Sequence, residues 1–305
     1  MRSRNDVTYS IIDLGTNTCL LLIATLENEK LTALFEAQEI PRIGKGIYET
    51  SRISRESFDK ALAIFENYKQ ISDDHNVRGI YAFGTSALRD AVNSKEFIEF
   101  ISSKTGIRIK VITGKQEAEC AFSGAVFDLP EDDYAVIDIG GGSTEISFRS
   151  DDTLINETMN IGSVRLTEMY FRNGYGQNAV SQAEELIGKS IVKLSLSPGK
   201  RKLVGVAGTI TTLSAVKNGM KEFEFGRIHG DVISLEDVSD ISNRLMNMNE
   251  AERLAIGDFM RGRSDIIVSG SLILKMLMER LGAGEIRVSA KGLRYGLMLN
   301  LDDFC

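Results

Sequence analysis

Two carboxylates and a run of small polar residues lie close together in the middle of the sequence. An apolar run ends in Asp138, three glycines and two hydroxyl residues follow, and Glu145 precedes a second apolar run. Glycines let several backbone N–H groups point into one concavity that binds phosphate oxygens, so we expect two antiparallel strands joined by a phosphate-binding turn. Two carboxylates beside such a turn fit a divalent cation between carboxylate and phosphate. The turn residues are Gly140, Gly141, Gly142, Ser143 and Thr144.

The beginning of the chain repeats this pattern. Asp13 and Gly15 have the spacing of Asp138 and Gly140, and apolar runs again flank the turn. A single glycine turn is most often an ordinary hairpin, but two acid–glycine hairpins half a chain apart indicate a duplicated domain that faces itself across a cleft. The polar side chains of this first turn are Thr16, Asn17 and Thr18.

Three further segments carry weaker signals for phosphate binding. The stretch 203–212 has the same strand-then-turn character without an acid, and its contacts would come from Gly208 and Thr209. Arg89 is expected in the first turn of a helix, where anions are attracted and a planar guanidinium suits phosphate. A surface salt bridge explains Arg89 equally well. The basic, glycine-rich segment 42–46 is equally compatible with a phosphate contact and with a plain solvated turn.

Composition limits the class of protein. The 305 residues, 43% of them hydrophobic, suffice for two domains with cores of their own. The formal charge of −7 argues against a nucleic-acid partner, so a polyanionic substrate would be held by local cations and metal. The three cysteines lie far apart, without metal-site or disulfide spacing, which indicates reduced thiols in the cytoplasm. We see no signal peptide and no run of membrane-spanning length, and expect no membrane partner.

Strands and helices alternate along the chain and position these residues. Strands are expected at about 7–14, 18–26 and 31–40, and Ser181 to Glu184 forms a capping-box pattern that predicts the start of a helix. The pattern breaks at 127–133, where Pro130 and four acids occur. This break predicts two domains. They are residues 1–127, with the first turn, and residues 128–305, with the second and third phosphate-binding segments.

Several segments together resemble the exopolyphosphatase / guanosine pentaphosphate phosphatase family. The resemblance covers essentially the whole chain and places it in the acetate kinase, sugar kinase, Hsp70 and actin superfamily. It implies an α/β fold of two actin-like (ribonuclease H-like) domains with a cleft between them, and a homodimer. The segments that carry it are 13–18, 84–91, 114–118, 137–145 and 205–210, and the shorter stretches 227–230, 263–267 and 292–296 agree.

The resemblance also implies roles for individual residues. Glu117 matches the catalytic glutamate of the family, although its position alone is equally typical of an acid that complements a helix dipole. Asp138 and Glu145, with Asp13 as a third candidate, would hold Mg²⁺ or Mn²⁺. The sequence departs from the family at Gln116, where many members carry a glutamate.

The function implied is hydrolysis of the terminal phosphoanhydride of inorganic polyphosphate, which releases orthophosphate. Guanosine pentaphosphate is the alternative substrate, and we expect polyphosphate to be preferred because the chain resembles the short family members with two domains. An ATP-dependent small-molecule kinase of the same superfamily would use the glycine turns equally well. A polyphosphate- or nucleotide-binding regulator without turnover is the third reading. The complete set of family segments favours the hydrolase.

Overall fold

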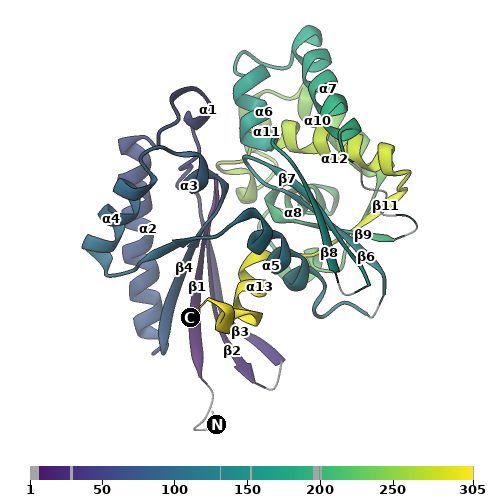
Figure 1. The fold of residues 1–305 in the computed structure, drawn as a ribbon. Coiled ribbons are helices and arrows are strands. Elements are labelled where there is room, and N and C mark those ends of the chain that lie inside the picture. The colour runs from purple at the N-terminus through teal and green to yellow at the C-terminus, as the bar shows by residue number, and fades with distance from the viewer. Residues whose placement is uncertain are drawn as a thin grey trace. The chain divides into compact units, whose positions relative to one another are not determined.

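The computed structural model describes residues 7–27, 30–130, 132–151, 153–194, 199 and 201–304. The chain divides into two compact units. Unit 1 is Met1–Gly124 with Leu293–Cys305, and unit 2 is Ala125–Gly292. Each unit contains one sheet with helices against it (Figure 1), which confirms the expected α/β class.

The sheet of unit 1 has the strand order β3-β2-β1-β4-β5. The first three strands form an antiparallel meander, whereas β4 is parallel to β1 and β5 is parallel to β4. The strands are β1 (Thr8–Leu14), β2 (Cys19–Glu27), β3 (Lys30–Glu39), β4 (Gly79–Gly84) and β5 (Ile109–Val111). Their bounds lie within one residue of the expected strands at 7–14, 18–26 and 31–40.

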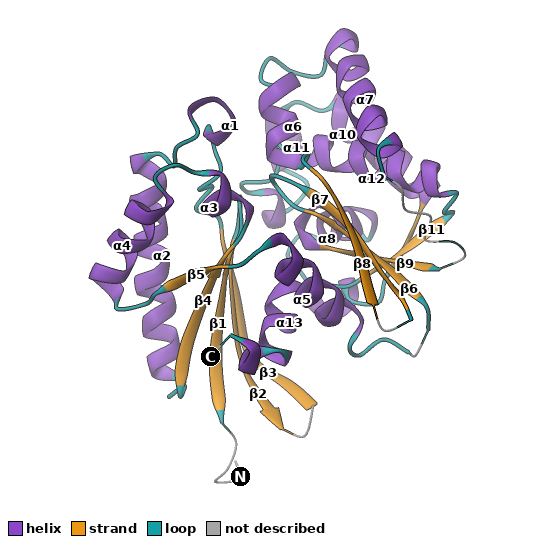
Figure 2. Ribbon diagram, viewed as in Figure 1, coloured by secondary structure: helices purple, strands orange, loops and turns teal. Residues whose placement is uncertain are grey.

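Two long helices bury apolar side chains against this sheet (Figure 2). Helix α2 (Arg55–Asp74) begins at Ser54, whose hydroxyl accepts the Ser57 N–H at 3.2 Å. Phe58 and Phe65 of α2 are buried, and each such side chain contributes about 1.5–3 kcal/mol. Helix α4 (Ser94–Thr105) packs beside α2 and adds Phe97 and Ile101 to the same core. The shorter helices of this unit are α1 (Ile47–Thr50), α3 (Ser86–Asp90) and α5 (Gly114–Val126).

The last helix, α13 (Leu293–Leu299), belongs to unit 1 and contacts β1 and β2. The expected domain bounds, 1–127 and 128–305, therefore need correction for this helix. Tyr295 is buried, and its hydroxyl donates to Glu36 Oε1 of β3 at 2.8 Å. Arg294 pairs with the other carboxylate oxygen of Glu36. These side chains find their partners in unit 1, which sequence position alone did not reveal.

Gly296 provides the closest packing of α13. A Cβ atom on this glycine would overlap the backbone carbonyl of Cys120 in α5. We expect Gly296→Ala to destabilise unit 1 by about 1–3 kcal/mol, because two helix backbones must separate. Thermal unfolding measures this, and Gly284→Ala is the matched control because no atom lies within 4 Å of its Cβ position. An unchanged melting temperature in Gly296→Ala would contradict this prediction, because it would show that α13 can shift away from α5 without loss of stability.

The sheet of unit 2 has the order β10-β11-β9-β6-β7-β8. The meander of β6, β7 and β8 is antiparallel, β9 is parallel to β6, and β11 is parallel to β9. This repeats the connections of unit 1 and confirms the expected duplication. The strands are β6 (Tyr134–Ile139), β7 (Thr144–Ser150), β8 (Thr153–Met159), β9 (Lys202–Val206), β10 (Val232–Ser234) and β11 (Glu285–Val288).

The helices of unit 2 surround α12 (Ile267–Leu281), which packs against α6, α7, α8 and α10. The capping box expected at Ser181 is wrong, because α7 has already begun at Gln177 and Ser181 lies inside it. A complete capping box does occur between Ser234 and Asp237, at the start of α10. The described residues contain no helix with the length and apolarity to cross a bilayer. The remaining helices are α6 (Ser163–Tyr170), α7 (Gln177–Val192), α8 (Ala207–Lys217), α9 (Phe225–Ile228), α10 (Leu235–Asn247) and α11 (Glu250–Leu254).

Candidate active site

Two adjacent parallel strands of unit 2 bring the glycine turn 140–144 and the glycine-containing segment 203–212 together. Asp138 of β6 is opposite Val206 of β9 in the sheet register. The turn after β6 and the helix after β9 therefore begin at the same edge of the sheet. Ligands of open α/β sheets commonly bind at this edge, beyond the carboxyl ends of the strands.

The turn between β6 and β7 leaves backbone N–H groups available for an anion. Gly140 N–H closes the turn on Ser143 O at 3.0 Å, and the carbonyls of Gly140 and Gly141 each accept an N–H from the start of α6 at 2.9 Å. Gly162 lets α6 approach, since a Cβ there would lie 2.6 Å from Gly141 O. None of the backbone hydrogen bonds of the described chain uses the N–H of Gly141 or Gly142. The carbonyls are thus occupied by the fold, and these donors suit phosphate oxygens.

The hydroxyls of this region contribute less than the sequence suggested. Thr144 is fully buried, and its hydroxyl donates to Ile161 O at 2.8 Å. Its single proton is therefore used within the fold. Thr209 is also buried, and its hydroxyl makes a long contact of 3.4 Å to Ile139 O. Ser143 remains beside the turn as the third hydroxyl, and it is 7% exposed.

The segment 203–212 ends in the start of a helix and not in a turn between strands. Helix α8 begins at Ala207, so Gly208 and Thr209 lie in its first turn, where backbone N–H groups lack intrahelical acceptors. Ala207 has a φ of 66°, the left-handed region that costs a residue with a side chain about 1–3 kcal/mol. The helix dipole and these N–H groups favour an anion at this position.

Arg263 is the functional candidate that sequence reasoning missed. Its side chain lies against Gly208, where a Cβ atom would overlap the guanidinium. Arg263 is only 8% exposed, and burial lowers its pKa to about 10, so it remains charged at neutral pH. The segment 263–267 resembles the family, but neither spacing nor periodicity connects it to Gly208.

Two carboxylates are opposite each other at the same end of unit 2. Asp138 of β6 pairs with Glu145 of β7 in the register, so both side chains are on one face with Cβ atoms about 4.5–5.5 Å apart. Like charges in this arrangement repel, and a divalent cation would offset that repulsion. The described residues form no cluster of three or more metal-binding side chains. The donor set therefore fits a cation such as Mg²⁺ that keeps water or phosphate oxygens as its remaining ligands.

Unit 1 repeats the turn with a different neighbour. Gly15 N–H closes on Thr18 O at 2.9 Å, as Gly140 does on Ser143. Asp13 is buried at the position equivalent to Asp138, but its register partner is Leu20 and not an acid. The structure thus brings two of the three expected metal ligands together, and Asp13 lies in the other unit.

The basic segment 42–46 packs directly on the first turn. Arg42 N–H donates to Asn17 O at 3.1 Å, and Gly44 N–H donates to Thr16 O at 2.8 Å. A Cβ atom on Gly44 would overlap the Thr16 side chain. The segment is therefore a support for the turn and not the plain solvated turn that the sequence equally allowed.

Arg89 and Glu117 meet at the carboxyl end of the unit 1 sheet. Arg89 lies in α3 after β4, and Glu117 lies in the first turn of α5 after β5. Arg89 Nη1 donates to Glu117 Oε2 at 2.6 Å and to Ile112 O at 3.1 Å. Both side chains are largely shielded, with exposures of 27% and 15%. Arg89 does form an ion pair, but with the expected catalytic carboxylate.

Opposing effects act on the Glu117 carboxyl. Burial raises its pKa, whereas Arg89 and a hydrogen bond from the Thr85 side chain lower it, and the pKa remains above its ordinary value. A carboxylate acts as an efficient general base when its pKa approaches the working pH. Glu117 is thus a largely shielded, oriented carboxylate with a guanidinium beside it, which suits proton abstraction next to a bound phosphate.

Comparison with known proteins agrees with this geometry. A model of the Ppx/GppA phosphatase family matches residues 22–303. The bifunctional 3-dehydroquinate synthase/phosphatase of Fusobacterium nucleatum is 31% identical over 97% of the chain, which spans about half (47%) of that protein. Exopolyphosphatase 2 of Mycobacterium tuberculosis is 30% identical over 95% of the chain and 97% of its own length. A guanosine-5'-triphosphate,3'-diphosphate pyrophosphatase of Photobacterium profundum is 26% identical over 96% of the chain and 59% of its own length.

Solved structures show the same fold. An exopolyphosphatase from Cytophaga hutchinsonii superimposes with a TM-score of 0.88 at 27% identity, over 97% of this chain and 98% of that one. The Ppx/GppA family member of Aquifex aeolicus superimposes with a TM-score of 0.80 at 27% identity, over 98% of both chains.

Proposed function

Because the chain belongs to the Ppx/GppA phosphatase family, we propose that it hydrolyses the terminal phosphoanhydride of inorganic polyphosphate and releases orthophosphate. The observation that carries the proposal is the bond between Arg89 and the largely shielded Glu117. In this pair, a guanidinium that can bind phosphate lies beside a carboxylate that can accept a proton. Hydrolysis by water requires such a base, whereas binding of phosphate alone does not.

Substrate phosphates would be held mainly by backbone donors and by arginine. In unit 2, the N–H groups of Gly141 and Gly142, the start of α8 and the Arg263 guanidinium all offer hydrogen-bond donors at the same edge of the sheet. In unit 1, the turn closed by Gly15 is equivalent. These groups recognise phosphate oxygens but no base or sugar, which suits a chain made only of phosphates.

Arg89 would bind phosphate while it positions Glu117. Its hydrogen bonds to Ile112 and Glu117 both use Nη1, so the Nε and Nη2 hydrogens can reach a phosphate oxygen. Glu117 Oε2 is engaged by Arg89, and Oε1 is the oxygen expected to accept the proton of an attacking water. The proton moves to Glu117 as the water oxygen bonds to the terminal phosphorus and the bridging oxygen leaves with the shortened chain.

Asp138 and Glu145 would hold Mg²⁺ or Mn²⁺, with Asp13 as a further candidate. A bound cation would neutralise part of the negative charge on the transferred phosphoryl group. Asp138 and Glu145 would orient it from one face of the β6–β7 hairpin.

We expect Glu145→Ala to raise the metal concentration needed for half-maximal activity and to weaken Mn²⁺ binding measured by electron paramagnetic resonance. The reason is that one of two opposed carboxylates is removed from the hairpin. Glu185→Ala, on the exposed face of α7, is the control and should bind Mn²⁺ as the wild type does. If Asp138→Ala and Glu145→Ala both bind Mn²⁺ with wild-type affinity, the metal site lies elsewhere.

Polyphosphate is the preferred substrate in this proposal, and guanosine pentaphosphate is the second candidate. The exopolyphosphatase of Mycobacterium tuberculosis is matched over nearly its whole length, whereas the guanosine-named relative is matched over 59% of its length. We extend the proposal to a homodimer in the cytoplasm. Cys19 and Cys120 are buried free thiols, and burial raises the pKa of both, which suits a reducing compartment.

Phosphate release tests the proposal against its alternatives. The assay compares polyphosphates of defined length, guanosine pentaphosphate, and ATP with and without a small-molecule acceptor. We expect orthophosphate from polyphosphate with the highest kcat/KM. Phosphate transfer to an acceptor would identify a kinase, and binding without release would identify a regulator. A higher kcat/KM for guanosine pentaphosphate than for every polyphosphate would reverse the order of substrates.

A further inference from the structure

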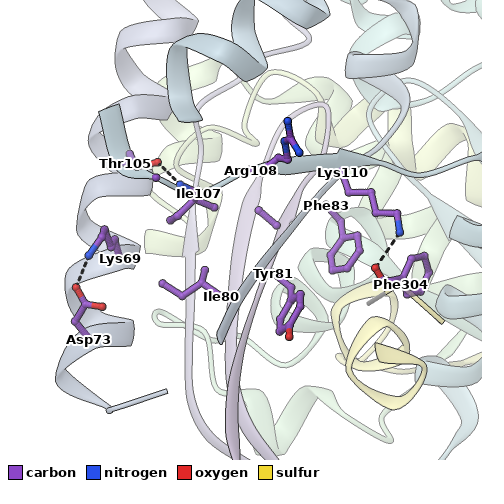
Figure 3. A pocket seen from close by; sticks show the side chains of 12 residues that line it. Lys69, Asp73, Ile80, Tyr81, Phe83, Thr105, Ile107, Arg108, Lys110 and Phe304 are labelled. Atoms are coloured by element: carbon purple, nitrogen blue, oxygen red, sulfur yellow. Dashed lines mark hydrogen bonds and ion pairs between the residues drawn. The ribbon is translucent and has the colours of Figure 1, made fainter. Parts of the chain in front are cut away.

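A cavity of about 540 Å³ opens at the edge of the unit 1 sheet, where β4 extends beyond the short strand β5 (Figure 3). Its lining on β4 runs from Ile80 to Phe83, whereas Arg89 and Glu117 lie in the helices that follow β4 and β5. Cavities of about 300–1,000 Å³ accept small organic ligands. Nothing in the proposed hydrolysis uses this cavity.

Aromatic rings and a cation share one face of this sheet edge. Phe83 of β4 is the register partner of Lys110 of β5. The ring of Phe304 packs edge-on against Phe83, with centroids 5.1 Å apart. Lys110 Nζ donates to Phe304 O at 2.9 Å and lies 5.2 Å from the centre of that ring. Tyr81 precedes Phe83 by two residues, so the strand alternation puts it on the same face.

The charges that line the cavity leave a positive excess. Lys69 pairs with Asp73 at 2.6 Å, so these two charges compensate each other. Across the described residues, neither Arg108 nor Lys110 forms an ion pair with a carboxylate. Two cations without a carboxylate partner among the described residues are notable in a chain of net charge −7, and they attract an anion.

The open edge of β4 adds backbone polar groups. Strand β5 pairs with Ala82, Phe83 and Gly84 only, so Ile80 lies beyond its end. Gly84 O accepts the Ile112 N–H on the β5 side. Because the direction of strand hydrogen bonding alternates, the N–H and C=O of Ile80 point to the same side as those of Gly84. They offer a donor and an acceptor side by side, which matches the edge of a purine base.

We propose that this cavity binds a nucleoside polyphosphate. The base lies against Tyr81 and Phe304, its edge meets the backbone of Ile80, and its phosphates contact Arg108 and Lys110. Inorganic anions would use only the two cations, and apolar ligands would use only the rings. A nucleotide uses both, and it also has the size of the cavity.

Photolabelling of the full-length chain with an azido-adenine analogue of ATP tests this site. We expect the label on peptides that contain Tyr81 or Phe304. Arg108→Ala should weaken nucleotide binding about tenfold, because a charge-assisted contact to phosphate is lost. Arg108 is exposed, so this variant should fold normally. Lys95→Ala, an equally exposed cation outside the cavity, is the matched control and should label as the wild type does.

Competition separates this site from the phosphate-binding turns. Unlabelled ATP should remove the label, and inorganic tripolyphosphate, which has no base, should remove far less. Labelling confined to peptides 13–18 or 140–145, no labelling, or unchanged labelling in Arg108→Ala would each overturn the proposal. The readout is binding and not turnover, so it stands or falls independently of the proposed hydrolysis.

Discussion

Glu117→Gln should lower kcat by a factor on the order of 10²–10⁴, because the amide cannot accept a proton from water. The substitution keeps the shape of the side chain and an oxygen that can still accept the bond from Arg89 Nη1. Substrate affinity should therefore be retained, or improved by the loss of a negative charge near phosphate. Single-turnover phosphate release from polyphosphate, with the melting temperature measured in parallel, separates a chemical effect from unfolding.

Glu119→Gln is the internal control for this experiment. Glu119 is in the same helix, but it is exposed, and its Oε1 lies 3.9 Å from Lys115 Nζ. It should retain wild-type kcat. If Glu119→Gln is inactive and Glu117→Gln is active, the base has been assigned two residues too early. If both variants are active, water is activated by another group, and Asp13 and Asp138 become the candidates.

The parts of the fold that depend on local chemistry could be predicted from the sequence. The two acid–glycine hairpins set their own register, because a tight turn allows few pairings of the strands that it joins. The opposition of Asp138 and Glu145 follows from that register. Phe58 and Phe65 of α2 are seven residues apart, and helical periodicity places both on the same buried face.

The parts that depend on contacts between distant segments could not be predicted. No local pattern shows that Arg263 covers Gly208, or that Glu36 binds Arg294 and Tyr295. The site geometry depends on these contacts as much as on the turns. The failed capping box at Ser181 has another cause: its pattern of residue types also occurs inside a helix, and α7 begins one turn earlier.

Arg89→Ala should reduce kcat/KM for polyphosphate more than a single phosphate contact would account for. Loss of the charge-assisted contact alone costs about 1.5–3 kcal/mol. The substitution also removes the guanidinium that lowers the pKa of Glu117, while burial continues to raise it. The carboxylate form is the active form, so a higher pKa moves the acidic limb of the pH–rate profile to higher pH. The measurement is kcat/KM against pH for both proteins.

Two further variants distinguish this pairing from a simple phosphate contact. Arg89→Lys keeps a positive charge but not the planar fork, so it should recover part of the rate and most of the pH shift. In a Glu117→Gln background, Arg89→Ala should cost much less than it does alone, because the carboxylate that it positions has gone. Suppose instead that Arg89→Ala lowers kcat/KM as much in the Glu117→Gln background as it does alone, and that it does not move the acidic limb of the pH–rate profile. Arg89 would then bind phosphate without acting on Glu117.

The stability of Arg89→Ala relative to wild type should also fall as pH rises, since the raised pKa opposes ionisation of Glu117 in the folded chain.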